Sequence, residues 1–270
     1  MKRWLTILLV CLVACGGYLW YLLPSSESNG TGDVAIARFD RMEMLYLSTG
    51  DLSALQQMKT NYPTETRTLI EDVLQLGHVD EPDINARFLS FFRDSTLQNL
   101  MVDVDSQYSD VSDIDRQLSA AFARLHQYLP HLAIPRVYAQ VGSLDESIVV
   151  GDGTLGISLD KYLGENHPVY LKYGYTERQR KMMTRQYIVP DCLGFYLLSC
   201  YPLPAEAADS LPLRDAHIAC IQWVVNKVMA HDLFTRESVR QVAAYMKAHP
   251  DTDVHKLLSF GYTEVDGHRK

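Results

Sequence analysis

The stretch Ile148-Val-Val-Gly-Asp-Gly-Thr-Leu-Gly-Ile-Ser-Leu-Asp160 decides the fold, because helical periodicity gives way to strand periodicity there. Gly151, Gly153 and Gly156 satisfy the G-x-G-x-x-G spacing of a dinucleotide-binding turn. Such a turn needs a helix after its last glycines, so that free N–H groups face a pyrophosphate. The residues after Gly156 instead alternate apolar and polar side chains, and Asp152-Gly153 is typical of a hairpin turn. We therefore predict a β-hairpin and not a nucleotide site.

The same stretch runs into a second motif, S-x-x-K, formed by Ser158 and Lys161. A lysine can activate a serine at this spacing only when a helix brings both side chains to one side. In a strand that continues through Lys161, the two side chains would point to opposite faces. The companion motifs Ser-Asp-Asn and Lys-Thr-Gly do not occur in the sequence, so we expect no acyl-enzyme chemistry from this pair.

The hairpin belongs to a short region of strand periodicity in a chain that is otherwise helical. Apolar residues alternate over 134–141, 147–150 and 154–159, which predicts three strands. A period near 3.6 runs through 33–129, and a second helical pattern runs from Thr176 through Cys200. The sequence therefore predicts an α+β fold, mostly helical, with one short central sheet of mixed or antiparallel strands.

The composition is that of a globular protein, since 47% of the 270 residues are hydrophobic. The formal net charge is −8, and apart from short groups such as Lys2-Arg3 no run of basic residues stands out. Binding to nucleic acid or to an anionic membrane surface draws its affinity from clustered lysine and arginine. We therefore expect no nucleic-acid partner.

The N-terminus carries a membrane-targeting segment. Residues 4–23 contain no charge, and they follow two basic residues and precede a polar linker over 24–32. The positive-inside rule puts the remainder of the chain outside the cytoplasm. We therefore expect a signal or anchor over 1–23, a flexible linker over 24–32 and one globular domain over 33–270.

Two kinds of anchor fit this segment. Leu12-Val-Ala-Cys15 resembles a bacterial lipobox, which would put a lipidated Cys15 at the mature N-terminus. The uncharged stretch is also long enough to cross a bilayer core as an uncleaved transmembrane helix. Residues 16–23 are unusually apolar for the segment after a lipidated cysteine, so both alternatives stay open. Either anchor would hold the domain at an envelope membrane.

The sequence contains no familiar metal or redox motif. The nine histidines form no H-E-x-x-H, and no C-x-x-C pair occurs. The acidic run that begins at Asp103 lacks the glycine and the glutamate that a calcium loop needs. Cys192 and Cys200 are eight residues apart in a helical pattern, which is too far for a disulfide. We predict no metal and no cofactor.

Five short segments carry a likeness to a known family. They are Arg38-Phe-Asp40, Asn61-Tyr-Pro63, Gly156-Ile-Ser-Leu-Asp-Lys-Tyr-Leu-Gly164, His167-Pro-Val-Tyr170 and Tyr187-Ile-Val-Pro-Asp191. In these segments the chain resembles the gliding-motility lipoprotein GldB family of the Bacteroidetes. The likeness extends over about residues 33–233. It implies a protein tethered to the cell envelope, which agrees with the lipobox at Cys15.

The family also looks distantly similar to zinc-dependent peptidases of the zincin type. Zincins combine an edge strand that lines the substrate cleft with a helix carrying H-E-x-x-H, which supplies two zinc ligands and a general base. In this chain the helix in the corresponding place begins Tyr187-Ile-Val-Pro-Asp191 and contains neither histidine nor glutamate. The resemblance therefore implies a zincin-like architecture without peptidase chemistry, with Tyr187 and Asp191 where the metal motif would stand.

The same resemblance implies a candidate cleft beside the hairpin. The strand over Thr154 to Leu159 is expected at the edge of the sheet, where a peptide could dock by strand addition. The candidate cleft positions in this strand and in the run after it are Gly156, Ser158, Asp160, Tyr162 and Gly164.

Three hypotheses about function follow. The first is a non-catalytic envelope lipoprotein that supports gliding motility or secretion machinery through contacts with an envelope protein complex. The second is a zinc-dependent, peptidase-like hydrolase with an unrecognised site, to which scattered groups would contribute, such as Asp160, Asp191, His167 and His217. The third is a solute-binding or carbohydrate-handling lipoprotein. We favour the first hypothesis, because the resemblance comes without the zinc ligands.

Overall fold

A three-stranded sheet forms around the hairpin stretch in the computed structural model, which describes residues 33–267. Its strands are β1 (Arg136–Gln140), β2 (Ile148–Gly151) and β3 (Thr154–Ser158), in the order β1-β3-β2. β3 is parallel to β1 and antiparallel to β2, so the sheet is mixed. The predicted α+β class with one short sheet is confirmed.

The turn between β2 and β3 has the predicted form. Gly151 pairs with Thr154, which leaves Asp152 and Gly153 as a two-residue loop. Gly153 has a φ of 64°, a value that glycine adopts without steric cost. Because β3 and not a helix follows the turn, the glycine spacing serves the hairpin.

The region before the sheet is helical. Its helices are α2 (Phe39–Thr49), α3 (Leu52–Asn61), α4 (Pro63–Arg67), the π-helix η1 (Thr68–Val73), α5 (Ile84–Phe91), α6 (Ser95–Gln107) and α7 (Ser112–Tyr128). Local signals explain two of the starts. The Asp51 side chain accepts a hydrogen bond from the Ser53 N–H at the start of α3, and Pro63 occupies the first turn of α4.

Helices also form most of the chain after the sheet. They are the 3-10 helix η2 (Leu159–Tyr162), α8 (Pro168–Lys172), α9 (Glu177–Met182), the 3-10 helix η3 (Arg185–Tyr187), α10 (Ile188–Cys200), α11 (Ala205–Ala208), α12 (Leu211–Met229), α13 (Glu237–Ala248), α14 (Val254–Lys256), the π-helix η4 (Leu257–Gly261) and α15 (Tyr262–Gly267). The prediction of one helical run from Thr176 through Cys200 is wrong at Met183-Thr184. Thr184 forms an antiparallel bridge with Leu163, and this pairing requires extended backbone.

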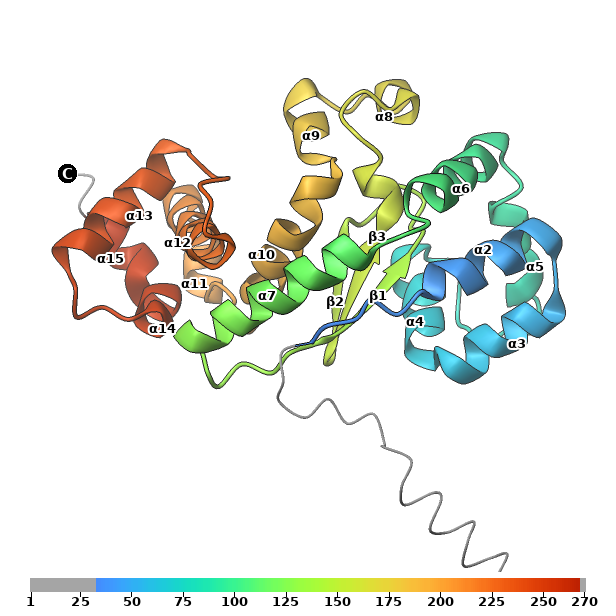
Figure 1. Cartoon of the computed structure of the whole chain (residues 1–270), viewed down its shortest axis with the longest axis horizontal. Coiled ribbons are helices and arrows are strands. Elements are labelled where there is room, and N and C mark those ends of the chain that lie inside the picture. The colour runs from blue at the N-terminus through green and yellow to red at the C-terminus, as the bar shows by residue number, and fades with distance from the viewer. Residues whose placement is uncertain (1–32, 268–270) are drawn as a thin grey trace, which may run out of the picture. The chain divides into compact units, whose positions relative to one another are not determined.

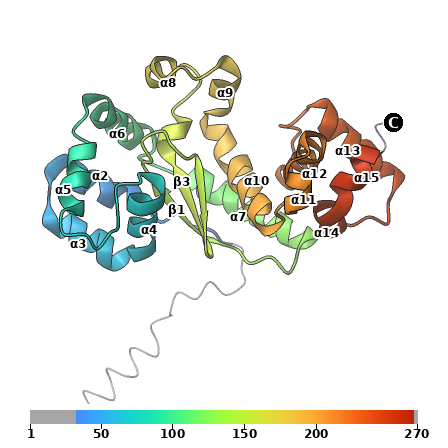
Figure 2. The same cartoon turned by 180° about the vertical axis from the view of Figure 1, so that it is seen from behind.

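The sheet lies between two groups of helices. Figures 1 and 2 show α2 to α6 on one side of the sheet and α10 on the other, with α11 to α15 beyond α10. α2 packs against β1, whereas α10 packs against β2 and β3. The hydrophobic core runs through these layers and includes Phe39, Tyr138, Leu155, Ile157 and Leu193.

The first described residues join the sheet along β1. Ala37 forms a parallel bridge with Tyr138, in which its N–H donates to the Val137 carbonyl and its carbonyl accepts from the Ala139 N–H, both at 2.9 Å. The Ile36 N–H donates to Asp115 Oδ1 on α7 at 2.9 Å. The first described residues are therefore attached to β1 and α7.

Residues Gly32–Lys270 group as one compact unit. Within the described range, no helix is both long enough and apolar enough to cross a bilayer. The predicted anchor over 1–23, its Cys15 and the linker over 24–32 lie outside the described residues.

Candidate functional site

The strand expected to border a cleft lies in the middle of the sheet. β3 pairs with β1 along one side and with β2 along the other. Its backbone groups are therefore engaged in sheet hydrogen bonds on both sides. The prediction that Thr154 to Leu159 is an edge strand open to a docking peptide is wrong. Periodicity predicts strands but not their order, and the pairing of β1 with β3 is non-local.

Gly156 allows an aromatic ring to lie across the central strand. In the parallel register it stands opposite Tyr138 of β1. A Cβ atom at position 156 would lie 2.6 Å from both Cζ and Oη of Tyr138, which is far too close for non-bonded atoms. Two positions further on, the Ser158 hydroxyl accepts a 3.2 Å hydrogen bond from Gln140 Nε2. Both candidate residues therefore contribute to packing within the sheet.

Asp160 is fully buried and holds the loop between β1 and β2. Its Oδ1 accepts a hydrogen bond from the Gly142 N–H at 2.8 Å, and its Oδ2 accepts one from the Leu144 N–H at 2.6 Å. Burial raises the pKa of Asp160, while these two N–H groups lower it. Ser143 and Leu144 have φ values of 52° and 67°, which are unfavourable for residues with a Cβ. The carboxylate thus stabilises a strained loop.

Tyr162 and Asp191 form a largely buried pair between η2 and α10. The Tyr162 hydroxyl donates a hydrogen bond of 2.9 Å to Asp191 Oδ2. Burial raises the pKa of Asp191 to about 7, and the hydrogen bond from Tyr162 acts against this rise. Tyr187 ends η3 directly before α10. In α10, which stands where the resemblance would place the zinc motif, the Asp191 carboxyl group therefore bonds to Tyr162 of η2.

Gly164 and Lys161 fix the segment that leaves the sheet. Gly164 has a φ of 116°, and its N–H donates to the Met183 carbonyl at 3.0 Å. The expected strand through Lys161 is wrong, because the chain turns into η2 after Ser158. Lys161 Nζ donates to the Leu144 carbonyl at 3.1 Å, and no contact between Lys161 and Ser158 occurs among the hydrogen bonds of the described residues.

The four groups considered for a hydrolase have separate partners. His167 Nε2 lies 3.1 Å from Asp103 Oδ2 on α6. His217 lies on α12, where its Nε2 is 2.9 Å from the Tyr201 carbonyl oxygen. Asp160 and Asp191 bond to the backbone and to Tyr162, as described above. Between residues 33 and 267, no three histidine, cysteine, aspartate or glutamate side chains gather as metal ligands would.

Three fully buried carboxyl groups in the N-terminal helices were not anticipated from the sequence: Asp40, Glu43 and Glu65. Asp40 is 2.7 Å from the Arg38 guanidinium, and Glu65 is 2.6 Å from that of Arg136 on β1. These two ion pairs fix the N-terminal segment and attach α4 to the sheet. Buried carboxylates of this kind are retained when a cationic partner compensates for their lost hydration.

Glu43 has no cationic partner of this kind among the described contacts. Its Oε2 accepts a 2.9 Å hydrogen bond from the Val141 N–H, whereas its Oε1 has no hydrogen-bond partner in the described part of the chain. Burial raises the pKa of Glu43 well above its usual value, and the nearby Asp160 and Asp40 add to the rise. Its position between Phe39 and Leu47 on one helix face is the signal that could have revealed its burial.

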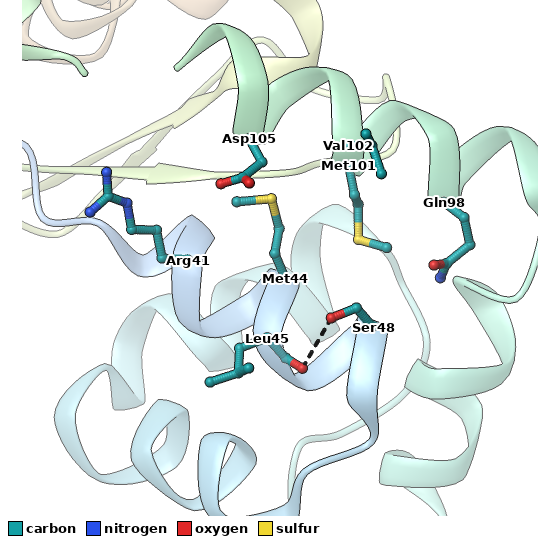
Figure 3. A pocket seen from close by; sticks show the side chains of 8 residues that line it. All are labelled: Arg41, Met44, Leu45, Ser48, Gln98, Met101, Val102 and Asp105. Carbon is teal, nitrogen blue, oxygen red and sulfur yellow. Dashed lines mark hydrogen bonds between the residues drawn. The ribbon is translucent and has the colours of Figure 1, made fainter. Parts of the chain in front are cut away.

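A groove between α2 and α6 is a hollow that no sequence motif marked (Figure 3). Its volume is about 470 Å³, and it is lined by Arg41, Met44, Leu45, Ser48, Gln98, Met101, Val102 and Asp105. Arg41 and Asp105 lie together at one end, and Gln98 lies at the other. Leu45 and Val102 are 41% and 67% exposed, so the groove offers apolar surface to solvent. Only the folded arrangement brings its two helices together.

Comparisons with known proteins agree with the resemblance in the sequence. No curated protein and no solved structure matches the chain. The family described as gliding motility protein GldB matches residues 25–212, which is more than half of the chain. That range includes the sheet, η2 and α10, with every candidate position from Gly156 to Asp191. The chain therefore belongs to the GldB family of gliding-motility proteins.

Proposed function

We propose that this chain is a non-catalytic lipoprotein of the cell envelope that supports gliding or secretion machinery through protein contacts. The observation that carries the proposal is the family match over residues 25–212. Membership in a family of gliding-motility lipoproteins gives the envelope location and the link to motility. The finer proposal is that this chain acts by binding other envelope proteins and does not catalyse a reaction.

The contacts of the candidate residues support a role without catalysis. Asp160 accepts two backbone hydrogen bonds, and Asp191 accepts one from Tyr162. A general base needs a lone pair within reach of a substrate proton. These carboxyl groups face the backbone and a neighbouring side chain instead. Such contacts are typical of residues that hold loops and helices in position.

The proposed anchor lies in the first 23 residues, with Cys15 as the lipidated residue. The lipobox-like Leu12-Val-Ala-Cys15 and the lipoprotein character of the family support this choice over a transmembrane helix. Residues 24–32 would then link the lipid to one globular domain over 33–270. A single acyl anchor binds membranes only weakly, whereas the several acyl chains of a bacterial lipoprotein hold it firmly.

The groove between α2 and α6 is the surface that we propose for the protein contact, with an amphipathic helix of an envelope protein as its occupant. Met44 and Met101 provide a flexible apolar floor between two helices, which suits recognition of a third helix. Arg41 and Asp105 at one end offer one charge of each sign. A helix carrying an acidic and a basic residue one turn apart would complement both charges.

Photo-crosslinking in cells tests this contact. A photoreactive phenylalanine replacing Val102, which is 67% exposed in the groove, should crosslink to one envelope protein. The matched control replaces Leu211, which is 68% exposed on α12 outside the groove. Val102→Asp should also abolish the crosslink formed from a photoreactive residue at Leu45. Equal crosslinking from Val102 and Leu211, or none from either, would contradict the proposal.

Metal analysis tests the non-catalytic part of the proposal. The full chain, purified in detergent, is expected to contain no stoichiometric zinc. Zinc at one equivalent that is lost in Asp191→Ala would overturn the proposal and favour the zinc-dependent, peptidase-like hydrolase. The zincin-like architecture stays a prediction from the resemblance. One equivalent of zinc that is lost in Asp191→Ala would support that architecture.

A further inference from the structure

A second hollow of about 500 Å³ lies between α6 and α8, and six of its nine lining residues have polar side chains, beside apolar surface. The lining residues are Ser95, Thr96, Asn99, Leu100, Asp103, His167, Pro168, Val169 and Lys172. Ser95, Asn99 and Asp103 are spaced four residues apart on α6, so they form one polar stripe along the helix. Ligand pockets in proteins have volumes of about 300 to 1,000 Å³, and this pocket falls within that range.

Two contacts tie the walls of this pocket together. Lys172 Nζ donates a 2.7 Å hydrogen bond to Thr96 Oγ1, and His167 Nε2 lies 3.1 Å from Asp103 Oδ2. Thr96 and Asp103 are seven residues apart on α6, which is about 10 Å along a helix. The pocket is therefore held open between two fixed points, and a ligand would not have to order its walls.

Several polar groups in and beside these two contacts are available to a ligand. The Ser95 hydroxyl and the Asn99 amide make no side-chain hydrogen bond with the described part of the chain. The Asp103 side chain is 50% exposed, and Lys172 has donors beyond the one that it gives to Thr96. The pocket thus combines donors and acceptors at close spacing, whereas an apolar ligand would leave them unpaired.

Two carboxylates and one lysine lie in and around this pocket. Lys172 faces Asp94, the N-cap of α6, whose pKa is lowered mainly by the Thr96 N–H and also by Lys172. Asp103 adds a second negative charge on the same helix beside His167. A phosphate would meet two carboxylates there, which opposes its binding. These charges disfavour an anion, whereas a neutral ligand with many hydroxyl groups can bond to the donors and acceptors alike.

We propose that the pocket between α6 and α8 binds carbohydrate, with room for about one or two sugar rings. Asn99 and Asp103 bind sugar hydroxyls from one wall, and Lys172 binds them from the other. Leu100, Pro168 and Val169 also line the pocket and offer apolar surface beside the polar groups, against which the apolar face of a sugar can pack.

This inference goes beyond the proposed function, because it concerns a different surface and a different kind of ligand. A glycan contact on the α8 side of α6 does not depend on a protein contact on its α2 side. Loss of either one would leave the other intact, and the variants below do not alter the groove lined by Met44 and Met101.

A glycan array probed with the full chain in detergent, followed by calorimetry with the best glycan, tests the proposal. Asn99→Ala should weaken binding about tenfold or more, as should Lys172→Met. Asn99→Ala removes no side-chain hydrogen bond of the described fold, so loss of binding cannot be ascribed to unfolding when the thermal melt is unchanged. Lys247→Met, at an exposed lysine of α13, is the control and should bind normally.

Three results would overturn the proposal. The first is an array on which no glycan binds above the level of a blank spot. The second is a glycan whose affinity is unchanged in both pocket variants. The third is inorganic phosphate that binds in calorimetry and displaces the glycan, because the site would then be an anion site.

Discussion

At the scale of single residues, Glu43 is the least expected feature of the fold. Its carboxyl group is fully buried, accepts one hydrogen bond from the Val141 N–H and has an elevated pKa. The folded chain therefore keeps the Glu43 proton at a pH where the unfolded chain has released it. Because the folded state then binds more protons, this residue makes the protein less stable as the pH rises above about 4.5.

Replacing Glu43 by glutamine should stabilise the protein at high pH. The amide oxygen can still accept the Val141 N–H, and the variant has no proton to lose. We expect Glu43→Gln to raise the free energy of unfolding by about 1 to 3 kcal/mol at pH 8, with a much smaller gain at pH 5. Urea denaturation at both pH values measures the difference.

The control for this prediction is Glu146→Gln, at an exposed residue of the loop before β2, which should change stability little at either pH. Asp160 and Asp191 also have raised pKa values, so the Glu43 variant should retain part of the wild-type pH dependence. An equal effect of Glu43→Gln at pH 5 and pH 8 would show that its carboxyl group is ionised in the fold.

Gly156 gives a second prediction at this scale. A Cβ atom there would collide with the Tyr138 ring, which is itself buried against the N-terminal helices. We expect Gly156→Ala to destabilise the protein by about 1 to 3 kcal/mol, as other overpacked cores are destabilised. Gly194→Ala on α10 is the matched control, because its Cβ would meet no atom within 4 Å. That variant should be neutral or about 0.5 to 1 kcal/mol more stable, since alanine favours a helix. Thermal unfolding distinguishes the two.

At the scale of elements, the loop between β1 and β2 depends on a residue that follows β3. Asp160→Ala would leave the N–H groups of Gly142 and Leu144 without their acceptors in a buried place. We expect a loss of about 2 to 5 kcal/mol in stability, with Asp160→Asn less affected because its amide keeps one acceptor. Hydrogen exchange at Gly142 and Leu144 should accelerate in both variants. Unchanged exchange at these amides would contradict this role of Asp160.

The elements themselves were largely predictable, because strand and helix periods are local properties of the sequence. The hairpin at Asp152-Gly153 follows from turn chemistry and two alternating runs. The break at Met183-Thr184 did not follow, because it arises from a bridge to Leu163, twenty-one positions earlier. The central place of β3 was missed for the same reason. Pairing partners are chosen by the packing of the whole sheet, which no local pattern describes.

At the scale of the whole molecule, the sequence was sufficient to indicate the family but not the hollows beside α6. The segments from Arg38 to Asp191 pointed to the GldB family, and the match over residues 25–212 confirmed it. The groove and the pocket on either side of α6 need α2 and α8, which lie far from each other in the sequence. The sequence pointed to His167 but not to its partner Asp103, because only the fold brings these two residues together.

The anchor gives a prediction for the whole molecule. If Cys15 carries the lipid, Cys15→Ser should prevent processing at this site, and the mature band should lose its radiolabel from palmitate. Wild-type chain and a Cys11→Ser control should both incorporate the label, because residue 11 lies before the cleavage point of the lipobox. Label that persists in Cys15→Ser would show that another residue carries the lipid, and a wild-type chain without label would contradict a lipid anchor.

The attachment of residues 34–39 to β1 and α7 has a mechanical consequence for the tethered lipoprotein proposed above. Among the described residues, the hydrogen bonds of Val34 with Ser119, the hydrogen bond from the Ile36 N–H to Asp115 and the Ala37 bridge are the first contacts to carry any force that arrives through the preceding chain. They pass that force to the sheet and to α7 together, and not to a single helix end that could fray. A pull on the preceding chain would thus be shared by the sheet and α7.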